Sequence, residues 1–288
     1  MKLATYEQNG MIGIGAVVED HIVDLSDIAP DMLSLIELGQ EGLDRARTAV
    51  TVAARTLPAD SVTLLAPIPS PRRNVMCLGL NYAEHIQEAN IARGRDTDLP
   101  QYPVIFNKAT TAVNAPFADI PFEAAVSEQI DWEAELGVVI GRAGKNIPRE
   151  QAMRHVFGYL VINDVSARDL QWRHKQFFKG KSLDGCCPTG PWIVTADAVP
   201  NPHALRITCR VNEVVKQDST TAHMIFNIPD TIYHLSQGMT LLPGDIIATG
   251  TPSGVGFART PPEFLRPGDV VECEIEGIGL IRNRVTAV

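Results

Sequence analysis

The 288-residue chain contains little cysteine and no long apolar run. Its five cysteines form an odd set without a C-x-x-C pair, as in a protein of a reducing compartment. No segment approaches the roughly 18 to 20 apolar residues that a membrane-spanning helix needs. The first ten residues, MKLATYEQNG, lack the apolar core of a secretion signal. We therefore predict a cytoplasmic location and no contact with a membrane.

An excess of basic residues is also missing. The chain has 25 Lys and Arg against 34 Asp and Glu, which gives a formal charge of −9. Nucleic acids and anionic membranes bind to basic patches, so we expect neither as a partner. The hydrophobic fraction of 45% is ordinary for a globular protein, and 22 Gly with 20 Pro favour many turns over long helices.

Residues 1–68 read as a small N-terminal α+β domain. An Asn9-Gly10 pair between two apolar runs predicts a tight hairpin. A helical pattern follows over residues 31–55, with a predicted break at Gly39 and Gly42.

The proline-rich segment 66–71 can neither continue a helix nor join a central strand, which places the domain boundary there. The second predicted domain covers residues 69–288. Short apolar runs alternate there with turn signals, which predicts a β-rich body. These runs are NVMCLGL, PVIFNK, AELGVVIG, FGYLVIN, PWIVTAD, LRITCRV, DIIATG and VVECEIEG.

Two acidic residues stand out before the most apolar of these runs. With the two-residue period of a strand, Glu133 and Glu135 project from one face, roughly 6 to 7 Å apart, while apolar residues fill the other. Two like charges beside an apolar run require a positive partner, such as a cation. An edge strand with solvated acids explains this segment equally well.

A third acid, Asp164, follows the buried-strand pattern GYLVIN and precedes a predicted helix. Alone it could be only an N-cap of that helix. Three carboxylates together with water suit Mg²⁺, Mn²⁺ or Ca²⁺ and do not match the usual His and Cys ligands of zinc. We take Mg²⁺ as the first choice.

His85 and Glu88 are spaced by three residues, which places both on one face of a helical turn. A carboxylate in this position would orient the imidazole as a general base. Most H-x-x-E pairs, however, are ordinary surface residues. The polar stretch 89–103 that follows is typical of a mobile lid or of a plain exposed loop.

Glycine-rich residues 250–256 follow another strand pattern. The segment could present amides and hydroxyls to a carboxylate, or could simply be a tight turn. As a dinucleotide-binding fingerprint it is incomplete, because Arg259 occupies the position of the last Gly or Ala.

Five segments, in this order, resemble the successive motifs of the fumarylacetoacetate hydrolase family. They are CLGLNYAEHIQE, IDWEAELGVVIGR, GYLVINDVSARDLQ, KGKSLDGCCPTGPW and GDIIATGTPSGVG. The resemblance runs over about residues 70–288 and implies a β-rich α+β fold, a mixed β-sheet roll with a small N-terminal domain. It also implies a homodimer.

By this resemblance, each candidate residue acquires a role. Metal ligation falls to Glu133, Glu135 and Asp164, water activation on a lid to His85 and Glu88, support of a developing anion to Lys181, and substrate binding to Gln171 and Thr251.

One position departs from the fumarylacetoacetases proper, which carry a further Asp ligand where this chain has Leu78. The chain therefore resembles the three-carboxylate branch, which includes acylpyruvate hydrolases, oxaloacetate decarboxylases and 2-hydroxyhepta-2,4-diene-1,7-dioate isomerases. This points to a small oxo acid as the substrate.

The first hypothesis from the sequence is metal-dependent C–C hydrolysis of a 2,4-dioxo acid of the acylpyruvate type. His85 would activate water, and the metal and Lys181 would stabilise the enolate. The alternative is metal-dependent decarboxylation or isomerisation of a small oxo acid, which uses the same enolate without the water. A remote alternative is a non-catalytic protein that binds a structural Ca²⁺.

Overall fold

A computed structural model describes residues 1–52, 55–93 and 99–288, with the side chains of 89–93 left out. Part of the predicted lid, residues 94–98, lies outside the described residues.

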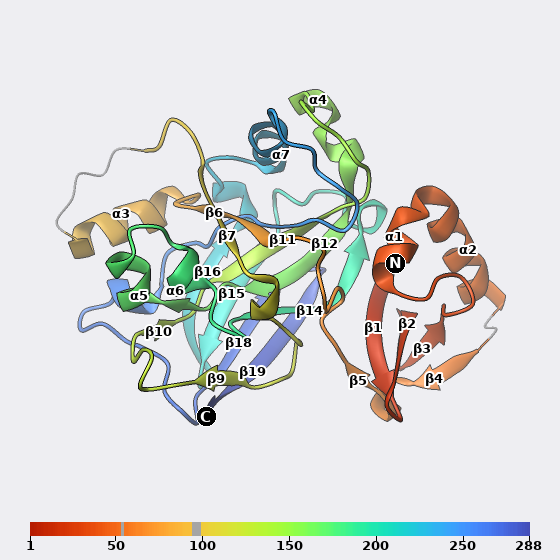
Figure 1. Cartoon of the computed structure of the whole chain (residues 1–288), viewed down its shortest axis with the longest axis horizontal. Coiled ribbons are helices and arrows are strands. Elements are labelled where there is room, and N and C mark those ends of the chain that lie inside the picture. Colours follow the sequence, from red (N-terminus) through yellow and green to blue (C-terminus); the bar gives the residue numbers. More distant parts are fainter. Residues whose placement is uncertain (53–54, 94–98) are drawn as a thin grey trace.

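The N-terminal strands lie together at one end of the molecule (Figure 1). They are β1 (Lys2–Gln8), β2 (Met11–Val18), β3 (His21–Asp24), β4 (Thr56–Pro58) and β5 (Thr63–Leu64). The predicted hairpin is confirmed, because β1 and β2 are antiparallel and Asn9 and Gly10 both have positive φ, 53° and 80°. Both central residues of a type I′ turn need this conformation.

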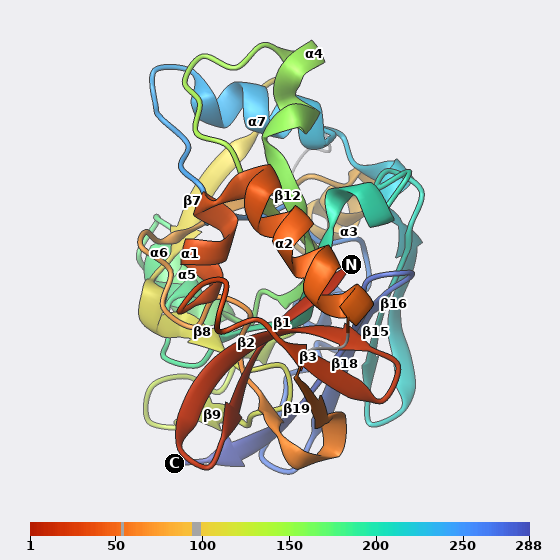
Figure 2. The ribbon, with the colours of Figure 1, turned by 90° about the vertical axis from the view of Figure 1, so that its right-hand side faces the viewer.

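Two helices cover these strands (Figure 2), α1 (Met32–Glu37) and α2 (Gly39–Val52). The predicted break at Gly39 is confirmed, and the residue has a φ of +57°. The predicted break at Gly42 is wrong. Gly42 lies buried inside α2, where a Cβ atom would come within 2.8 Å of the Leu35 carbonyl oxygen, so close helix packing explains this glycine.

One large mixed sheet connects the two halves of the sequence. Its order is β4-β3-β2-β1-β14-β12-β11-β17-β6-β7, with β5 beside β1 and β8 beside β14. β17 and β6 are parallel, whereas the other neighbours along this order are antiparallel. Because β1 pairs with β14, the N-terminal strands extend the sheet, and the division at residue 68 stays a prediction. The remaining strands of this sheet are β6 (Val75–Gly79), β7 (Val104–Lys108), β8 (Val113–Asn114), β11 (Ala134–Ile140), β12 (Val156–Asn163), β14 (Cys187–Thr195) and β17 (Ile246–Ala248).

A second sheet, in the order β16-β15-β18-β19-β9, packs on the strands β11, β12 and β14. Its strands are β9 (Ile120–Phe122), β15 (Arg206–Val211), β16 (Val214–Thr220), β18 (Val270–Ile275) and β19 (Gly279–Ala287). A short ladder joins β10 (Ile130–Asp131) to β13 (Ser166–Ala167). The predicted β-rich α+β class with mixed sheets is confirmed.

The helices of the remaining chain are short. The α-helices are α3 (Ala83–Arg93), α4 (Arg149–Ala152), α5 (Arg168–Arg173), α6 (Phe178–Lys181) and α7 (Ile228–Ser236). The 3₁₀ turns are η1 (Ala59–Ser61), η2 (Thr110–Ala112), η3 (Met153–His155), η4 (Ala196–Ala198), η5 (Thr221–His223) and η6 (Gly256–Ala258). Within the described residues, no helix has the length and apolar character needed to cross a membrane.

The central strands are buried on both faces. Every residue of β11 is buried, and its side chains alternate between two apolar clusters. Leu136 and Val138 belong to the cluster beneath the second sheet, and Val139 belongs to the cluster beneath α1 and α2. This arrangement explains why the sequence of β11 is an almost continuous apolar run. It also means that any charge at the ends of β11 lies deep inside the molecule.

All five cysteines are free and buried, which predicts unreactive thiols in the native state. Burial raises the pKa of Cys186 to about 11 and that of Cys187 to about 12, so both stay protonated at pH 8. Titration with a thiol-reactive disulfide reagent at pH 8 should label all five in denaturant and none rapidly without it. Rapid labelling of the native protein would contradict this burial.

Candidate metal centre and catalytic site

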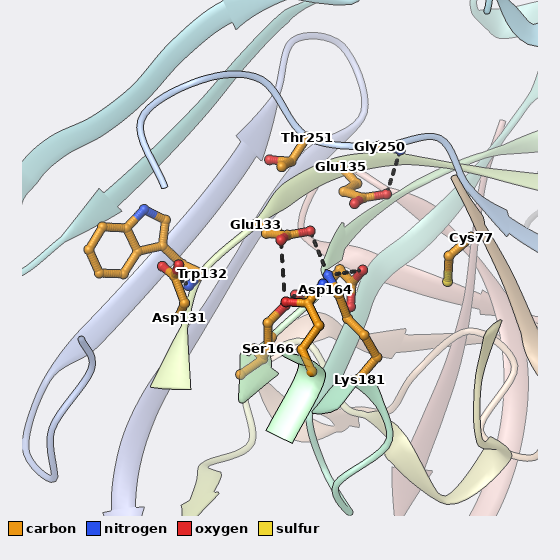
Figure 3. A network of polar contacts seen from close by, with 12 residues as sticks. Cys77, Asp131, Trp132, Glu133, Glu135, Asp164, Ser166, Lys181, Gly250 and Thr251 are labelled. Atoms are coloured by element: carbon orange, nitrogen blue, oxygen red, sulfur yellow. Dashed lines mark hydrogen bonds and ion pairs between the residues drawn. The ribbon is translucent and has the colours of Figure 1, made fainter. Parts of the chain in front are cut away.

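The three predicted carboxylates meet where β11 begins and β12 ends. Glu133 directly precedes β11, Glu135 lies within it, and Asp164 follows β12. The strands are antiparallel with Ala134 opposite Asn163, which brings these ends together, and the Asp164 amide donates to the Glu133 carbonyl at 2.8 Å. One carboxylate oxygen of each acid lies within 4.8 Å of the others (Figure 3).

Two of the simpler interpretations of these acids are wrong. Glu133 is 5% exposed and Glu135 is 0% exposed, so they are not solvated acids of an edge strand. The N-cap of α5 is Ala167, so Asp164 is not a helix cap. The structure brings the three acids together as expected, and their role as metal ligands stays a prediction.

Buried cations hold two of these carboxylates. Lys181 Nζ donates to Glu133 Oε2 and to Asp164 Oδ2, both at 2.8 Å (Figure 3). Lys108 Nζ donates to the other Asp164 oxygen at 2.7 Å. Arg168 lies 2.6 Å from Glu133 Oε1 through Nη1 and 2.8 Å from Asp131 Oδ2 through Nε. Lys181 and Arg168 hold the pKa of Glu133 well below its usual range, against the opposing effect of burial.

The third carboxylate has no such cation. Glu135 Oε2 accepts from the Gly250 amide at 2.7 Å, but Oε1 is buried with no hydrogen-bond partner. Burial, followed by the nearby Asp164 and Glu133, raises the pKa of Glu135 well above its usual value. Counting Asp131 with the three acids gives four carboxylates against Lys108, Arg168 and Lys181, so the cluster is one positive charge short of balance when all are ionised.

A divalent cation fits this arrangement. The three oxygen donors are hard ligands, as Mg²⁺, Mn²⁺ and Ca²⁺ prefer, and within the described residues the cluster includes no His or Cys. The partnerless Glu135 Oε1 is the atom that most clearly needs such a partner, because a buried charge is stable only when paired or bound to a metal.

The predicted dyad is formed at the start of α3. His85 Nδ1 lies 3.0 Å from Glu88 Oε1, and His85 is only 6% exposed, so it is not an ordinary surface residue. Glu88 also accepts a hydrogen bond from the Gly254 amide, at 2.9 Å to Oε2. In the tautomer with the proton on Nδ1, this contact is a hydrogen bond to Glu88 and leaves Nε2 with the free lone pair that a general base needs.

The glycine-rich segment 250–256 does present amides to carboxylates, but they are the protein's own. Gly250 donates to Glu135, Gly254 to Glu88, and Gly256 to Asp131 at 2.7 Å. Gly254 has a φ of +102°, and a Cβ atom there would lie 2.1 Å from the Lys216 carbonyl oxygen. Only glycine can therefore occupy this position without displacing the backbone that holds the dyad.

The two predicted substrate-binding residues differ in how they are held. The Thr251 hydroxyl donates to the Ala134 carbonyl at 2.8 Å and accepts from Gln217 at 2.7 Å, so protein atoms occupy it. Gln171 Oε1 accepts from Arg168 at 3.1 Å. Both residues line the same cavity, and their substrate-binding roles stay predictions.

An inner chamber joins the dyad to the cluster. Its lining includes His85, Glu133, Arg168, Gln171, Lys181 and Thr251, together with Leu78, Gly79, Leu80, Phe106, Phe177 and Phe257. Leu78, where fumarylacetoacetases carry an extra acid, therefore adds an apolar wall. The chamber brings together one carboxylate of the candidate cation site, a buried histidine and two cationic side chains, Arg168 and Lys181, which suits stabilisation of an anion next to a proton-transfer group.

Sequence reasoning missed Lys108, Arg168 and Asp131. The available signal was chemical: each is a charged residue at the end of an apolar run or beside one, and buried charges need partners. The Nη2 atom of Arg168 is buried without a hydrogen-bond partner, and the residue lines the inner chamber. An anionic ligand would supply that partner.

Comparison with known proteins identifies the family of the chain. The family described as "Fumarylacetoacetate (FAA) hydrolase C-terminal" matches residues 74–286. The chain is 40% identical to the oxaloacetate tautomerase YisK of Bacillus subtilis, with 99% of this chain and 100% of that protein covered. It therefore belongs to the fumarylacetoacetate hydrolase family, and it is an enzyme of that family.

Two of the similar solved structures illustrate the likeness over the whole chain. A fumarylacetoacetate hydrolase (EaFAH) from Exiguobacterium antarcticum has a TM-score of 0.86 and 42% identity, with 100% of both chains covered. The maleylpyruvate hydrolase of Sphingobium sp. SYK-6, solved with a manganese(II) ion and pyruvate, has a TM-score of 0.80 and 29% identity, with 100% and 99% covered.

The buried ion pairs predict unequal effects of two arginine substitutions on helix α5. Arg168→Met removes the partner of two buried carboxylates and should lower the free energy of unfolding by about 3–5 kcal/mol. Arg173→Met is the matched control. Its side chain is 63% exposed and lies 3.7 Å from Asp169, so its loss should cost less than about 1 kcal/mol. Denaturant unfolding of both metal-free variants measures the difference, and equal effects would contradict the proposed pairing.

Proposed function

We propose that this chain is a divalent-metal-dependent tautomerase that interconverts the keto and enol forms of oxaloacetate or a closely related 2-oxo acid. One observation carries the proposal: the inner chamber is lined both by the buried His85 and by Glu133, one of the three clustered carboxylates suited to a cation. The full-length similarity to an oxaloacetate tautomerase supports this choice among the reactions of the family.

In this proposal Glu133, Glu135 and Asp164 hold Mg²⁺, with Mn²⁺ or Ca²⁺ as the other ions that the oxygen ligands suit. When bound, the ion supplies a Lewis acid for the carboxylate and 2-oxo oxygens of the substrate. The similar maleylpyruvate hydrolase was solved with a manganese(II) ion and pyruvate, which supports a divalent ion in the proposed site.

The protein's own groups then move the proton. His85 Nε2 takes the proton from C3, the C–H electron pair forms the C2–C3 double bond, and the carbonyl pair moves onto the 2-oxo oxygen. Glu88 accepts a hydrogen bond from Nδ1–H and so stabilises the imidazolium. Lys181 uses two of its three donors on carboxylates and has one for the developing oxyanion. The His85 imidazolium then returns its Nε2 proton to that oxygen, which completes the enol and restores the neutral histidine; the reverse path restores the ketone.

Hydrolysis of a 2,4-dioxo acid is the second candidate. The same histidine could activate a water molecule for attack at the distal carbonyl, and the similarity to a maleylpyruvate hydrolase favours this reaction. Both reactions pass through the same enolate, so products distinguish them.

The test uses the purified chain with Mg²⁺ and the enol form of oxaloacetate. Loss of enol absorbance should be faster than the uncatalysed rate, should release no extra CO₂, and should stop with a chelator. If the enzyme converts 2,4-dioxopentanoate into pyruvate and acetate faster than it converts the enol of oxaloacetate, the proposed activity is hydrolysis and not tautomerisation. Release of extra CO₂ from oxaloacetate would show that the activity is decarboxylation and not tautomerisation.

Loss of the buried histidine should remove most of the activity. His85→Gln should lower kcat by about 100- to 10,000-fold, because general base catalysis contributes that much, and should leave Mg²⁺ affinity unchanged. The exposed histidine His223, whose side chain is 52% exposed, provides the control His223→Gln, which should be as active as the wild type. Full activity in His85→Gln would exclude its role in proton transfer.

A further inference from the structure

The inner chamber opens into a much larger outer chamber of about 920 Å³. Four residues line both spaces, Leu80, Gln171, Phe177 and Phe257. Drug-sized ligands occupy cavities of about 300–1,000 Å³. The outer chamber is therefore far larger than a four-carbon acid needs.

The inner chamber, in contrast, has about 30 Å³ of space. A cavity needs roughly 10–15 Å³, measured with a water-sized probe, for each water that it holds. The inner chamber accordingly accepts about two groups of the size of an oxygen atom. One carboxylate oxygen and the 2-oxo oxygen of a substrate would fill it, so the remaining atoms would extend into the outer chamber.

The walls of the outer chamber are mainly apolar. Beyond the four shared residues they comprise Val104, Gln129, Trp172, Lys175, Pro262 and Phe264. Trp172 and Phe257 pack edge to face, with ring centroids 5.5 Å apart. Edge-to-face packing is the favoured arrangement for aromatic rings, and an aromatic ligand can extend it.

The described walls of the outer chamber offer few cationic groups that could bind a second carboxylate of the substrate. Lys175 is its one cationic wall residue among those described, and its side chain is exposed to water. An exposed ion pair contributes only about 0–1 kcal/mol. The chamber therefore favours an apolar tail over a charged one.

Two residues that line this chamber have an unusual backbone conformation. Leu80 and Lys175 both have positive φ, 56° and 60°, although neither is glycine. Bulky residues rarely adopt this conformation, and such strain concentrates at ligand sites. Leu80 stands between the two chambers, and Lys175 lies on the outer wall.

We propose that the outer chamber is a subsite for a hydrophobic substrate tail, and that the enzyme acts on aryl-substituted 2-oxo acids such as phenylpyruvate. The inference rests on the proposed function, because the 2-oxo acid head occupies the inner chamber. The phenyl ring lies against Phe177, Phe257 and Phe264, and its burial adds binding free energy that oxaloacetate does not gain.

The first experiment compares phenylpyruvate with oxaloacetate on the Mg²⁺-loaded enzyme. Enol–keto conversion of each is followed by absorbance, and calorimetry gives the dissociation constant of each acid. We expect phenylpyruvate to be converted and to bind at least about tenfold more tightly, as filling an apolar pocket typically gives.

Strand β7 supplies a matched pair of variants. Val104 lines the outer chamber, whereas the next residue, Ile105, is 48% exposed and does not. Val104→Trp fills the chamber and should lower the ratio of kcat/KM for phenylpyruvate to that for oxaloacetate by about tenfold. Ile105→Trp should leave both values unchanged.

Phe264→Ala provides a second route if Val104→Trp folds poorly. It removes a ring from the wall and should weaken phenylpyruvate binding more than oxaloacetate binding. Conversion of oxaloacetate without binding or conversion of phenylpyruvate would overturn the tail subsite and leave the proposed function standing. The tail subsite would also be overturned if the ratio of kcat/KM for phenylpyruvate to that for oxaloacetate were the same in Val104→Trp and the wild type. Tight phenylpyruvate binding that depends on Val104, in a protein that converts neither acid, would support the subsite and refute the tautomerase.

Discussion

The structure depends on the balance of charge in the buried cluster at the start of β11. Four carboxylates and three cations lie there with almost no contact with water. Taking one ionised group out of water costs several kcal/mol, so each needs a partner of opposite charge or a proton. Lys108, Lys181 and Arg168 supply three partners, and Glu135 has only an amide for one of its two oxygens. A divalent cation would supply the missing positive charge with one unit left for an anionic substrate, and it would be the Lewis acid of the proposed reaction.

The loop at residues 250–256 connects the buried carboxylate cluster to the His85–Glu88 dyad. Its amides bind Glu88 on α3 and also Asp131 on β10 and Glu135 on β11, which belong to two distant parts of the sequence. The candidate cation site and the candidate proton-transfer group are therefore fixed relative to each other by one segment of backbone. Catalytic groups need this precision, because small displacements lower rates strongly. The apolar outer chamber adjoins the inner chamber through Leu80, Gln171, Phe177 and Phe257.

The sequence predicted the elements whose signal is local. The two-residue period placed Glu133 and Glu135 on one face, and the spacing of His85 and Glu88 predicted their contact. The ordered motifs predicted the fold class. Lys108 and Arg168 were missed because each pairs with a carboxylate far along the sequence. Lys108 binds Asp164, 56 residues away, and Arg168 binds Asp131, 37 residues away, and only the tertiary structure shows these pairs. The predicted break at Gly42 failed for the same reason, since a packing contact with Leu35 requires the glycine.

The variant Glu135→Gln tests the central claim most directly, through thermal unfolding with Mg²⁺ and with a chelator. Glutamine keeps an acceptor for the Gly250 amide and removes the charge that lacks a cation. Mg²⁺ should raise the Tm of the wild type and leave that of the variant unchanged, and the metal-free variant should unfold at or above the metal-free wild type. Equal stabilisation of both proteins by Mg²⁺, or no effect on the wild type, would contradict the account.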